Sequence, residues 1–480
     1  MSFHFILLLG IFLIHIAVIV RAIMVEGRDP YARLAWVMAL LLFPLLGVVA
    51  YAIFGEAWMS GRFRRKANRV FKQLESFPTA AGPKGSPLTG LPDHYVGPFR
   101  TCEALSQSTV TDCNTALLAR DSNAAIDLLV KDIAAACDSV HISFYIWLTD
   151  NNGLKVVESV RAAAARGVSC RVTVDAIGSR PLIKSEHWQN MQESGVQLCA
   201  SLSAPTGLRS IAARRIDLRN HRKIVVIDNW ITYCGSQNCA DPEFLPKARY
   251  APWVDILVRF TGPVAVQNQL IFASAWTVET GEDLTAYLEN AKALQGESDV
   301  LAIAFGTGPL SVKGAMSSAF VSLLYAADRE VVISTPYFVP DPPLLAAIIS
   351  CARRGVQTSL LLPKRNDSRV IGAISKGYYP QLLEAGVKVF EYGAGLLHSK
   401  TLVADGVVSL IGSANMDRRS LELNFENNIL LYSAELSQQI RQRQNVYLVS
   451  SIEITRADVK GRSFLRRFVE NVMTMVGAVY

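Results

Sequence analysis

The sequence lacks any cluster of metal-ligating residues. Its eight cysteines are scattered along 480 residues. Only Cys234 and Cys239 lie close together, at a spacing that matches no zinc pattern. Scattered thiols in apolar surroundings are typical of free, buried cysteines in a reducing cytoplasm. We therefore expect free thiols and neither a metal nor another cofactor.

The start of the chain lacks the features of a cleavable signal peptide. Residues 1–3 carry no lysine or arginine, and the segment after Arg21 offers no small-residue cleavage site. An apolar run nevertheless covers residues 3–20, and a second covers residues 34–54, with Pro44 as its main irregularity. At about 1.5 Å rise per residue, each run approaches or reaches the roughly 30 Å hydrocarbon core of a bilayer. We expect an uncleaved anchor of two transmembrane helices within residues 1–60.

Charged residues make up only 19% of the chain, but the net charge is +7. Six basic residues follow the second apolar run: Arg62, Arg64, Arg65, Lys66, Arg69 and Lys72. Three lie between the two runs: Arg21, Arg28 and Arg33. The positive-inside rule then predicts that both ends of the anchor lie in the cytoplasm. The basic cluster can also contact anionic lipid headgroups.

Beyond a proline-rich stretch at 77–99, the chain repeats itself. Helical patterns at 123–137 and 315–327 each precede an apolar strand, and each copy continues into a helix that ends on Arg-Gly-Val and a further strand. Alternating helices and strands predict an α/β fold, here two similar α/β/α domains in a pseudo-twofold arrangement. The predicted segments are an anchor (1–60), a basic juxtamembrane and linker segment (61–120), two domains (121–295 and 296–450) and an amphipathic tail (451–480).

The repeat carries two copies of one polar motif. The first copy contains His221, Lys223, Asp228, Gly235, Ser236 and Asn238, and the second contains His398, Lys400, Asp405, Gly412, Ser413 and Asn415. In a strand, residues two apart point to the same face, so each histidine projects beside its lysine. A single copy would be weak, because a histidine on a strand is more often structural. Two copies at equivalent places in a repeated fold predict one composite site.

Such a site suits a phosphodiester. Two lysines and the amides of Asn238 and Asn415 can stabilise negative charge on the phosphate oxygens, and Ser236 and Ser413 can assist them. One neutral histidine can attack phosphorus while the other, protonated, donates to the leaving oxygen. No metal is required, since the lysines supply the positive charge.

Each histidine needs a partner that fixes its tautomer. A carboxylate follows each motif in an apolar, strand-like context: Asp255 lies 34 residues after His221, and Glu426 lies 28 residues after His398. Their matching places in the repeat favour an orienting role over that of ordinary surface acids.

The doubled His-x-Lys-x4-Asp motif with its trailing Gly-Ser-x-Asn resembles the phospholipase D superfamily. With the apolar N-terminus, RDPYARLAW at 28–36, YAIFGE at 51–56 and TPYFVP at 335–340, the chain from about residue 3 to about residue 450 is similar to the bacterial cardiolipin synthases. The resemblance implies a multi-pass protein of the bacterial inner membrane. It also implies that two phosphatidylglycerol molecules give cardiolipin and glycerol through a phosphatidyl-histidine intermediate.

The resemblance assigns roles residue by residue. It implies that His221 and His398 are catalytic with Lys223 and Lys400, and that Asp228 and Asp405 hold the loop after each strand. By analogy with the superfamily, the N-terminal motif supplies the nucleophile. This favours His221, but the near-symmetry of the motifs leaves His398 as the alternative.

Two further segments have the composition of lipid-facing surfaces. The first half has an insertion with Arg209, Arg214, Arg215 and Arg219, which is either a solvated basic face or a headgroup-docking segment. Residues 462–480 place apolar side chains at helical spacing beside three arginines, so this tail either packs on the core or lies in the membrane interface.

Two other functions share some of these features. A nuclease of the same superfamily would need a long basic track with stacking aromatics and has little use for a membrane anchor. A lipid-binding scaffold would not require two intact histidine–lysine pairs. We therefore expect phosphatidylglycerol and anionic lipids as partners and no nucleic acid, and the sequence leaves the oligomeric state open.

Overall fold

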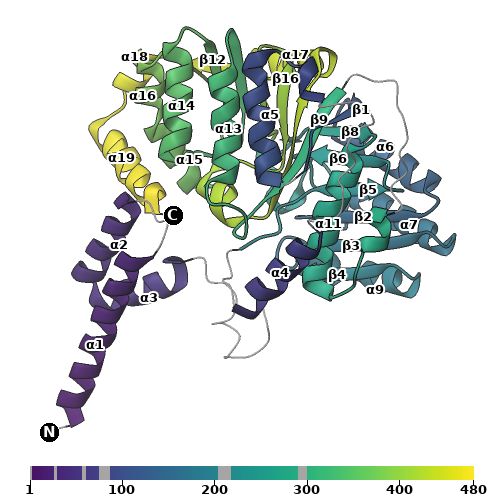
Figure 1. Cartoon of the computed structure of the whole chain (residues 1–480). Helices are drawn as coiled ribbons and strands as arrows, with labels where there is room; N and C mark the ends of the chain where they lie inside the picture. Colours follow the sequence, from purple (N-terminus) through teal and green to yellow (C-terminus); the bar gives the residue numbers. More distant parts are fainter. Residues whose placement is uncertain are drawn as a thin grey trace.

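The computed structural model describes residues 3–25, 30–56, 61–74, 87–106, 108–203, 218–289 and 300–479. Figure 1 shows two α/β halves side by side, with an N-terminal group of helices projecting from the second half. The N-terminal elements are α1 (Phe3–Met24), α2 (Pro30–Leu42), α3 (Pro44–Phe54), α4 (Gly61–Leu74), η1 (Pro87–Gly90) and α5 (Asp93–Ser106).

The first half contains β1 (Thr111–Leu118), α6 (Ser122–Ala135), β2 (Ser139–Phe144), α7 (Asn151–Ala165), β3 (Ser169–Asp175), α8 (Arg180–Ile183), α9 (Glu186–Glu193), β4 (Gln197–Ser201), β5 (Ile224–Ile227), β6 (Ile231–Gly235), η2 (Leu245–Tyr250), β7 (Trp253–Val254), β8 (Leu257–Thr261), α11 (Val264–Thr280) and α12 (Thr285–Glu289).

The second half contains β9 (Val300–Thr307), α13 (Ala315–Ala326), β10 (Glu330–Ser334), β11 (Phe338–Val339), α14 (Pro342–Arg353), β12 (Gln357–Pro363), α15 (Arg369–Gly377), α16 (Tyr379–Glu384), β13 (Lys388–Tyr392), β14 (Leu396–Leu397), β15 (Thr401–Ala404), β16 (Val408–Gly412), β17 (Met416–Asp417), η3 (Arg419–Leu423), β18 (Glu426–Tyr432) and α17 (Ala434–Val449). The chain ends with β19 (Ser451–Ile454), α18 (Arg456–Lys460) and α19 (Phe464–Val479).

Both halves belong to one continuous sheet, which has 15 strands within the described residues. Its order is β19-β13-β12-β10-β15-β16-β18-β9-β1-β8-β6-β5-β2-β3-β4. Read outward from the β9–β1 junction, the second half repeats the order of the first. A twofold relation between the halves produces this mirrored strand order. The predicted α/β fold and its duplication are therefore confirmed.

Local sequence explains the repeated units. Asp121, Asp150 and Asp341 cap α6, α7 and α14, because each carboxylate accepts a hydrogen bond from a backbone amide of the first helical turn. The turns after α7 and α14 place Gly167 and Gly355 at φ of 90° and 92°, a backbone conformation that favours glycine. The two Arg-Gly-Val segments are therefore helix-to-strand turns.

The apolar core continues across the junction of the halves. One buried cluster joins Val258 and Phe260 of β8 to Ala302 of β9, Ile411 of β16 and Ile429 of β18. Burial of such a shared apolar surface is the main force that fixes two layers against each other. The halves therefore hold one another in a defined register, which positions any site between them.

The segment predicted as a linker, 61–120, also contains regular structure. Its helix α4 packs against α11 of the first half, α5 packs against α13 of the second, and β1 joins the central sheet. At the other end of the chain, β19 extends the sheet as an edge strand beside β13. Regular structure thus starts before residue 121 and continues past residue 450.

The N-terminal apolar region differs from the expected pair of spanning helices. Among the described residues, His4–Met24 is the one helix that is long and apolar enough to cross a membrane. The second run is divided into α2 and α3 at Pro44, because proline cannot donate the amide hydrogen bond that a continuous helix requires. Trp36 of α2 and Tyr51 of α3 meet edge to face, with ring centroids 5.3 Å apart. One spanning helix is therefore found among the described residues, and the second of the two expected transmembrane helices is not confirmed.

Candidate active site

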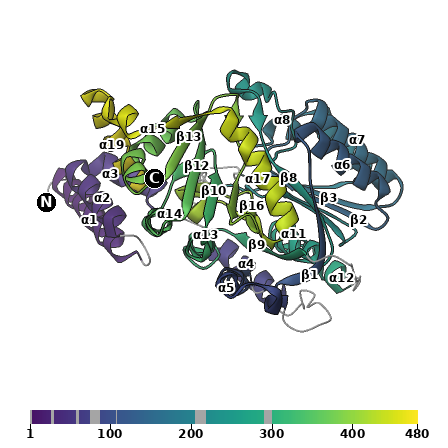
Figure 2. The same ribbon diagram turned by 90° about the horizontal axis from the view of Figure 1, so that it is seen from above.

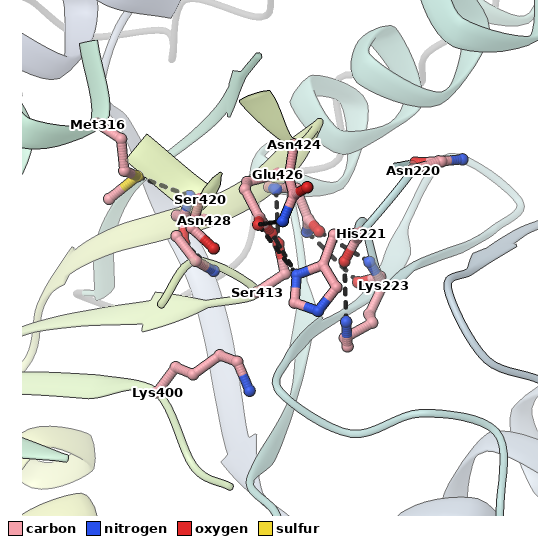
Figure 3. A network of polar contacts seen from close by, with 12 residues as sticks. Asn220, His221, Lys223, Met316, Lys400, Ser413, Ser420, Asn424, Glu426 and Asn428 are labelled. Atoms are coloured by element: carbon pink, nitrogen blue, oxygen red, sulfur yellow. Dashed lines mark hydrogen bonds and ion pairs between the residues drawn. The ribbon is translucent and has the colours of Figure 1, made fainter. Parts of the chain in front are cut away.

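Both histidine–lysine pairs lie just before the first residues of interior strands of the central sheet, β5 and β15. His221 precedes β5 and Lys223 borders it, while His398 follows β14 and Lys400 borders β15. All four side chains are buried, with at most 8% of the surface of each residue exposed. Each lysine ammonium donates to the backbone carbonyl of its own histidine at 2.8 Å. Figure 3 shows Lys223 beside His221 and Lys400 below and to the left of the imidazole ring.

Each histidine is held by a carboxylate from the opposite half. Nδ1 of His221 lies 2.8 Å from Oε2 of Glu426, and Nδ1 of His398 lies 2.6 Å from Oδ1 of Asp255. The two acids identified in the sequence are therefore in position to orient the imidazoles. The partners are exchanged between the halves, because each acid contacts the histidine of the other motif.

Backbone pairing between the halves explains this exchange. The short strand β7, just before Asp255, pairs in parallel with β14, just before His398. At the equivalent place, Asn220 bridges Phe425, and the amide of His221 donates to the carbonyl of Phe425 at 2.9 Å. Each histidine thus enters the site alongside the acid-bearing segment of the other half.

Ser236 and Ser413 hold the two carboxylates. The Ser236 hydroxyl donates to Oδ1 of Asp255 at 2.6 Å, and the Ser413 hydroxyl donates to Oε2 of Glu426 (Figure 3). Both serines are fully buried. Each hydroxyl proton is thus donated to an acid, and phosphate binding by these two serines stays a prediction.

The two motif asparagines have separate environments. Oδ1 of Asn238 accepts from the amide of Ile146 at 3.3 Å, so its NH₂ group is the donor left for a ligand. Asn415 is 3% exposed, and its Oδ1 has no hydrogen-bond partner among the described residues. Asn427 was missed in the sequence: its Oδ1 accepts from the amide of Lys223 at 2.9 Å. The signals that identify its neighbour Glu426, an acid in an apolar context at the place that matches Asp255, do not extend to an amide side chain.

Asp228 and Asp405 have a structural environment. Both occupy the left-handed region, at φ of 51° and 53°, in the turns after β5 and β15. The Asp228 carboxylate accepts from the amides of residues 137–139, and that of Asp405 accepts from the amides of residues 328–330. These bonds tie the turn to the start of the neighbouring strand, β2 or β10, as the expected loop-holding role requires.

Burial determines the charge states in the site. It lowers the pKa of His221 to about 4 and also lowers the pKa of His398, so both imidazoles are neutral near pH 7. Burial alone would raise the pKa values of Asp255 and Glu426, but the paired histidines and nearby lysines bring both below their ordinary values. The site thus combines two carboxylates with two neutral imidazoles.

The lysines are easier to deprotonate than free lysine. Burial, together with repulsion from Lys400, lowers the pKa of Lys223 to about 7, and burial lowers the pKa of Lys400 to about 8. The effect of Lys400 on Lys223 shows that the two halves contribute to one electrostatic site. An anionic ligand between these lysines would favour their charged forms.

Two aromatic side chains distinguish the histidines. The ring of Tyr145 lies 4.9 Å from that of His221, and the ring of Trp253 lies 4.6 Å from that of His398. Nζ of Lys400 is also 3.2 Å from Nε2 of His398. No such contact to Nε2 of His221 is found among the described residues. These contacts break the symmetry of the doubled motif, which sequence spacing could not reveal.

Of the arginines in the predicted basic insertion, Arg209, Arg214 and Arg215 lie outside the described residues. Arg219 comes just before Asn220, which bridges Phe425. The backbone amide of Phe425 donates a hydrogen bond to the backbone carbonyl of Arg219 at 2.9 Å.

The lysine environments predict an alkaline loss of activity. A cation that stabilises phosphate charge is present below its pKa and is lost as the pH rises through it, so kcat/KM should fall between about pH 7 and about pH 9. The profile of kcat should fall at higher pH, because a bound phosphodiester raises both pKa values. Initial rates in buffers of constant ionic strength test this. A flat kcat/KM profile over that interval would contradict it, and Lys223→Arg, which cannot deprotonate there, should weaken the fall.

Comparisons with known proteins identify related sequences along nearly the whole chain. Residues 129–249 and 320–445 match the family described as cardiolipin synthase, PLD-like domain, and residues 13–56 match the phospholipase D-nuclease N-terminal family. The chain is 32% identical over 476 residues to cardiolipin synthase A of Cronobacter sakazakii, covering 97% of this chain and 96% of that protein. It is 31% identical to cardiolipin synthase A of Klebsiella pneumoniae, covering 98% and 97%.

A solved structure shares the fold. The crystal structure of phosphatidylserine synthase from Haemophilus influenzae aligns with a TM-score of 0.55 and 13% identity, covering 86% of this chain and 96% of that one. At this identity the likeness concerns the fold alone.

Proposed function

Because the chain belongs to the cardiolipin synthase family of the phospholipase D superfamily, we propose that it joins two phosphatidylglycerol molecules into cardiolipin and releases glycerol. The observation that carries the proposal is the pair of crossed imidazole–carboxylate contacts beside two buried lysines. This arrangement provides a nucleophile, an acid and a cationic phosphate site in one place.

The proposed reaction has two balanced steps. Nε2 of His221 attacks phosphorus, and the bond from phosphorus to the oxygen of the headgroup glycerol breaks. Protonated His398 gives its proton to that oxygen. The negative phosphodiester raises the pKa of His398 above its value in the empty site, which allows it to carry this proton. A hydroxyl of the second phosphatidylglycerol then attacks phosphorus. His398 takes the hydroxyl proton, and the bond from phosphorus to His221 breaks.

His221 is the proposed nucleophile. Its Nε2 lone pair is left available, whereas Nε2 of His398 lies within hydrogen-bond distance of the Lys400 ammonium. Lys223, Lys400 and the amides of Asn238 and Asn415 are proposed to bind the phosphate oxygens, while Asp255 and Glu426 orient the histidines. Burial of the site restricts water, which favours a lipid hydroxyl as acceptor.

The membrane arrangement is also proposed. Both N-terminal apolar runs lie in the bacterial cytoplasmic membrane, and the anchor (1–60) places the two catalytic domains (121–295 and 296–450) on the cytoplasmic side. Support comes from α4, whose exposed basic side chains include Arg64, Arg65 and Lys72. Protease treatment of oriented inside-out and right-side-out vesicles tests the sidedness. Digestion of the catalytic domains from the periplasmic side would overturn it.

The product formed from phosphatidylglycerol tests the function. Purified full-length protein in vesicles is incubated with labelled phosphatidylglycerol or single-stranded DNA, each with and without EDTA. We expect labelled cardiolipin and free glycerol in equal amounts, unaffected by EDTA because the lysines supply the positive charge. Phosphatidic acid alone would indicate a hydrolase, DNA cleavage alone a nuclease, and no turnover a lipid-binding scaffold; each of these outcomes would contradict the proposal.

A further inference from the structure

A groove of about 520 Å³ opens between α15 and α19, outside the histidine site. One wall comes from the end of β12 and the loop that follows it, including Lys364 and Asn366, and from Arg369 at the start of α15. The opposite wall comes from Leu465, Arg466 and Val469 of α19. Nothing in the proposed chemistry uses this groove.

One wall of the groove is basic, and the other carries apolar side chains beside one arginine–glutamate pair. Four cations line it, Lys364, Arg369, Lys376 and Arg466, against one carboxylate, Glu470. Arg466 pairs with Glu470 at 3.0 Å, and Lys376 lies 3.6 Å from Glu391. Within the described part of the chain, no carboxylate lies at ion-pair distance from Lys364 or Arg369, both of which are exposed. Two cations are thus available to a phosphate beside an apolar wall.

The apolar wall is continuous with the membrane anchor. Helix α19 contacts α2, and both views of the molecule place it beside the anchor (Figures 1 and 2). Its exposed residues include Phe464, Leu465, Phe468 and Met475, with 56–76% of their surface accessible. An amphipathic helix with this exposure, next to a spanning helix, fits the membrane interface.

The groove also adjoins the active site. Strand β12, which leads into Lys364, is the neighbour of β10, and β10 is the neighbour of β15, which follows Lys400. Asp367 lies in the loop beside the groove, and its negative charge partly offsets the lowering of the Lys400 pKa by burial. Its carboxylate also accepts a hydrogen bond from the hydroxyl of Tyr337 at 2.7 Å. One loop therefore separates the groove from the catalytic lysine.

We propose that this groove binds an anionic phospholipid on its way from the bilayer to the histidines. Lys364 and Arg369 hold the phosphate, and the apolar face of α19 holds the first part of an acyl chain. The inference rests on the proposed function for the identity of the lipid as a substrate, but the binding itself can be measured without turnover.

Photocrosslinking in nanodiscs tests the groove. Full-length protein carrying His398→Ala, so that no lipid is consumed, is reconstituted with a phosphatidylglycerol that bears a photoactivatable acyl chain. We expect crosslinked peptides from residues 369–376 and 463–470. Lys364→Glu/Arg369→Glu should reduce this labelling by about 25-fold, because each of the two basic residues near an anionic surface contributes a factor of about five. Crosslinks to α1 in the same sample report incorporation.

The matched control is Lys131→Glu/Arg180→Glu, which makes the same charge change at exposed positions of the first half and should leave groove labelling unchanged. Thermal unfolding of each variant checks that it is folded. The same probe with a phosphatidylcholine headgroup should label the groove less, and inorganic phosphate should not compete. Equal labelling in the groove and control variants, or labelling confined to the anchor, would overturn the inference. Groove labelling, together with failure of the wild-type protein to make cardiolipin, would leave the groove standing and reject the proposed function.

Discussion

Replacement of either motif histidine by alanine should abolish turnover. We expect His221→Ala and His398→Ala each to lower kcat by at least about 10⁴-fold, because loss of one member of a nucleophile–acid pair disables the whole cycle. Production of labelled cardiolipin by the purified variants measures the effect. His94→Ala is the matched control, since His94 is an exposed histidine on α5. Near-normal activity in either folded site variant would contradict the mechanism.

A quench experiment on the wild-type enzyme can identify the nucleophile. Wild-type enzyme quenched early in the reaction with labelled phosphatidylglycerol should carry label on a histidine. We expect base-stable, acid-labile label in the peptide that contains His221 and none in the peptide that contains His398. Label on His398 would reverse the roles of the two motifs and leave the rest of the site unchanged.

Removal of an orienting carboxylate should have the second largest effect. We expect Glu426→Gln and Asp255→Asn each to lower kcat by about 10²- to 10⁴-fold, because the amide no longer fixes the tautomer of its histidine or stabilises its charge. Glutamine and asparagine have nearly the same shape as the acids they replace. The free energy of unfolding should therefore change less than kcat. Kinetics with phosphatidylglycerol and thermal unfolding separate the two effects.

A leaving-group test distinguishes crossed pairing from pairing within each half. A phosphatidyl ester of p-nitrophenol has a leaving group that needs no protonation. Because Asp255 contacts His398, the proposed acid, release of p-nitrophenol by Asp255→Asn should approach the wild-type burst. Glu426→Gln should remain slow, since Glu426 serves the nucleophile. The opposite pattern would mean that each acid assists the histidine of its own half, or that His398 is the nucleophile.

Much of the site could be predicted because its determinants are local. The spacing of His221 and Lys223 places both side chains at the start of one strand, and the same spacing recurs at His398 and Lys400. The Arg-Gly-Val turns depend on a conformation that glycine adopts within a few residues. Repetition of these local signals predicted the duplicated α/β fold, and strand order confirmed it.

Other features depend on contacts between distant segments. Asp255 and His398 are 143 residues apart, and Glu426 and His221 are 205 apart. Their pairing follows from the β7–β14 contact and the Asn220–Phe425 bridge, which no local pattern encodes. The hydrogen bonds from Ser236 to Asp255 and from Ser413 to Glu426 also join separate segments of the chain. The motif spacing alone does not show that these hydroxyls contact carboxylates.

The sequence by itself determined the fold class, the residues of the site and the apolar N-terminus, because periodicity and spacing act over a few residues. Only the tertiary structure decided which acid serves which histidine, how burial lowers the pKa values of the lysines, and where the groove beside α19 lies. These properties arise from the joining of the two halves in one sheet and from the packing of α19 next to the anchor. Both depend on which distant surfaces meet, and a linear pattern does not specify that.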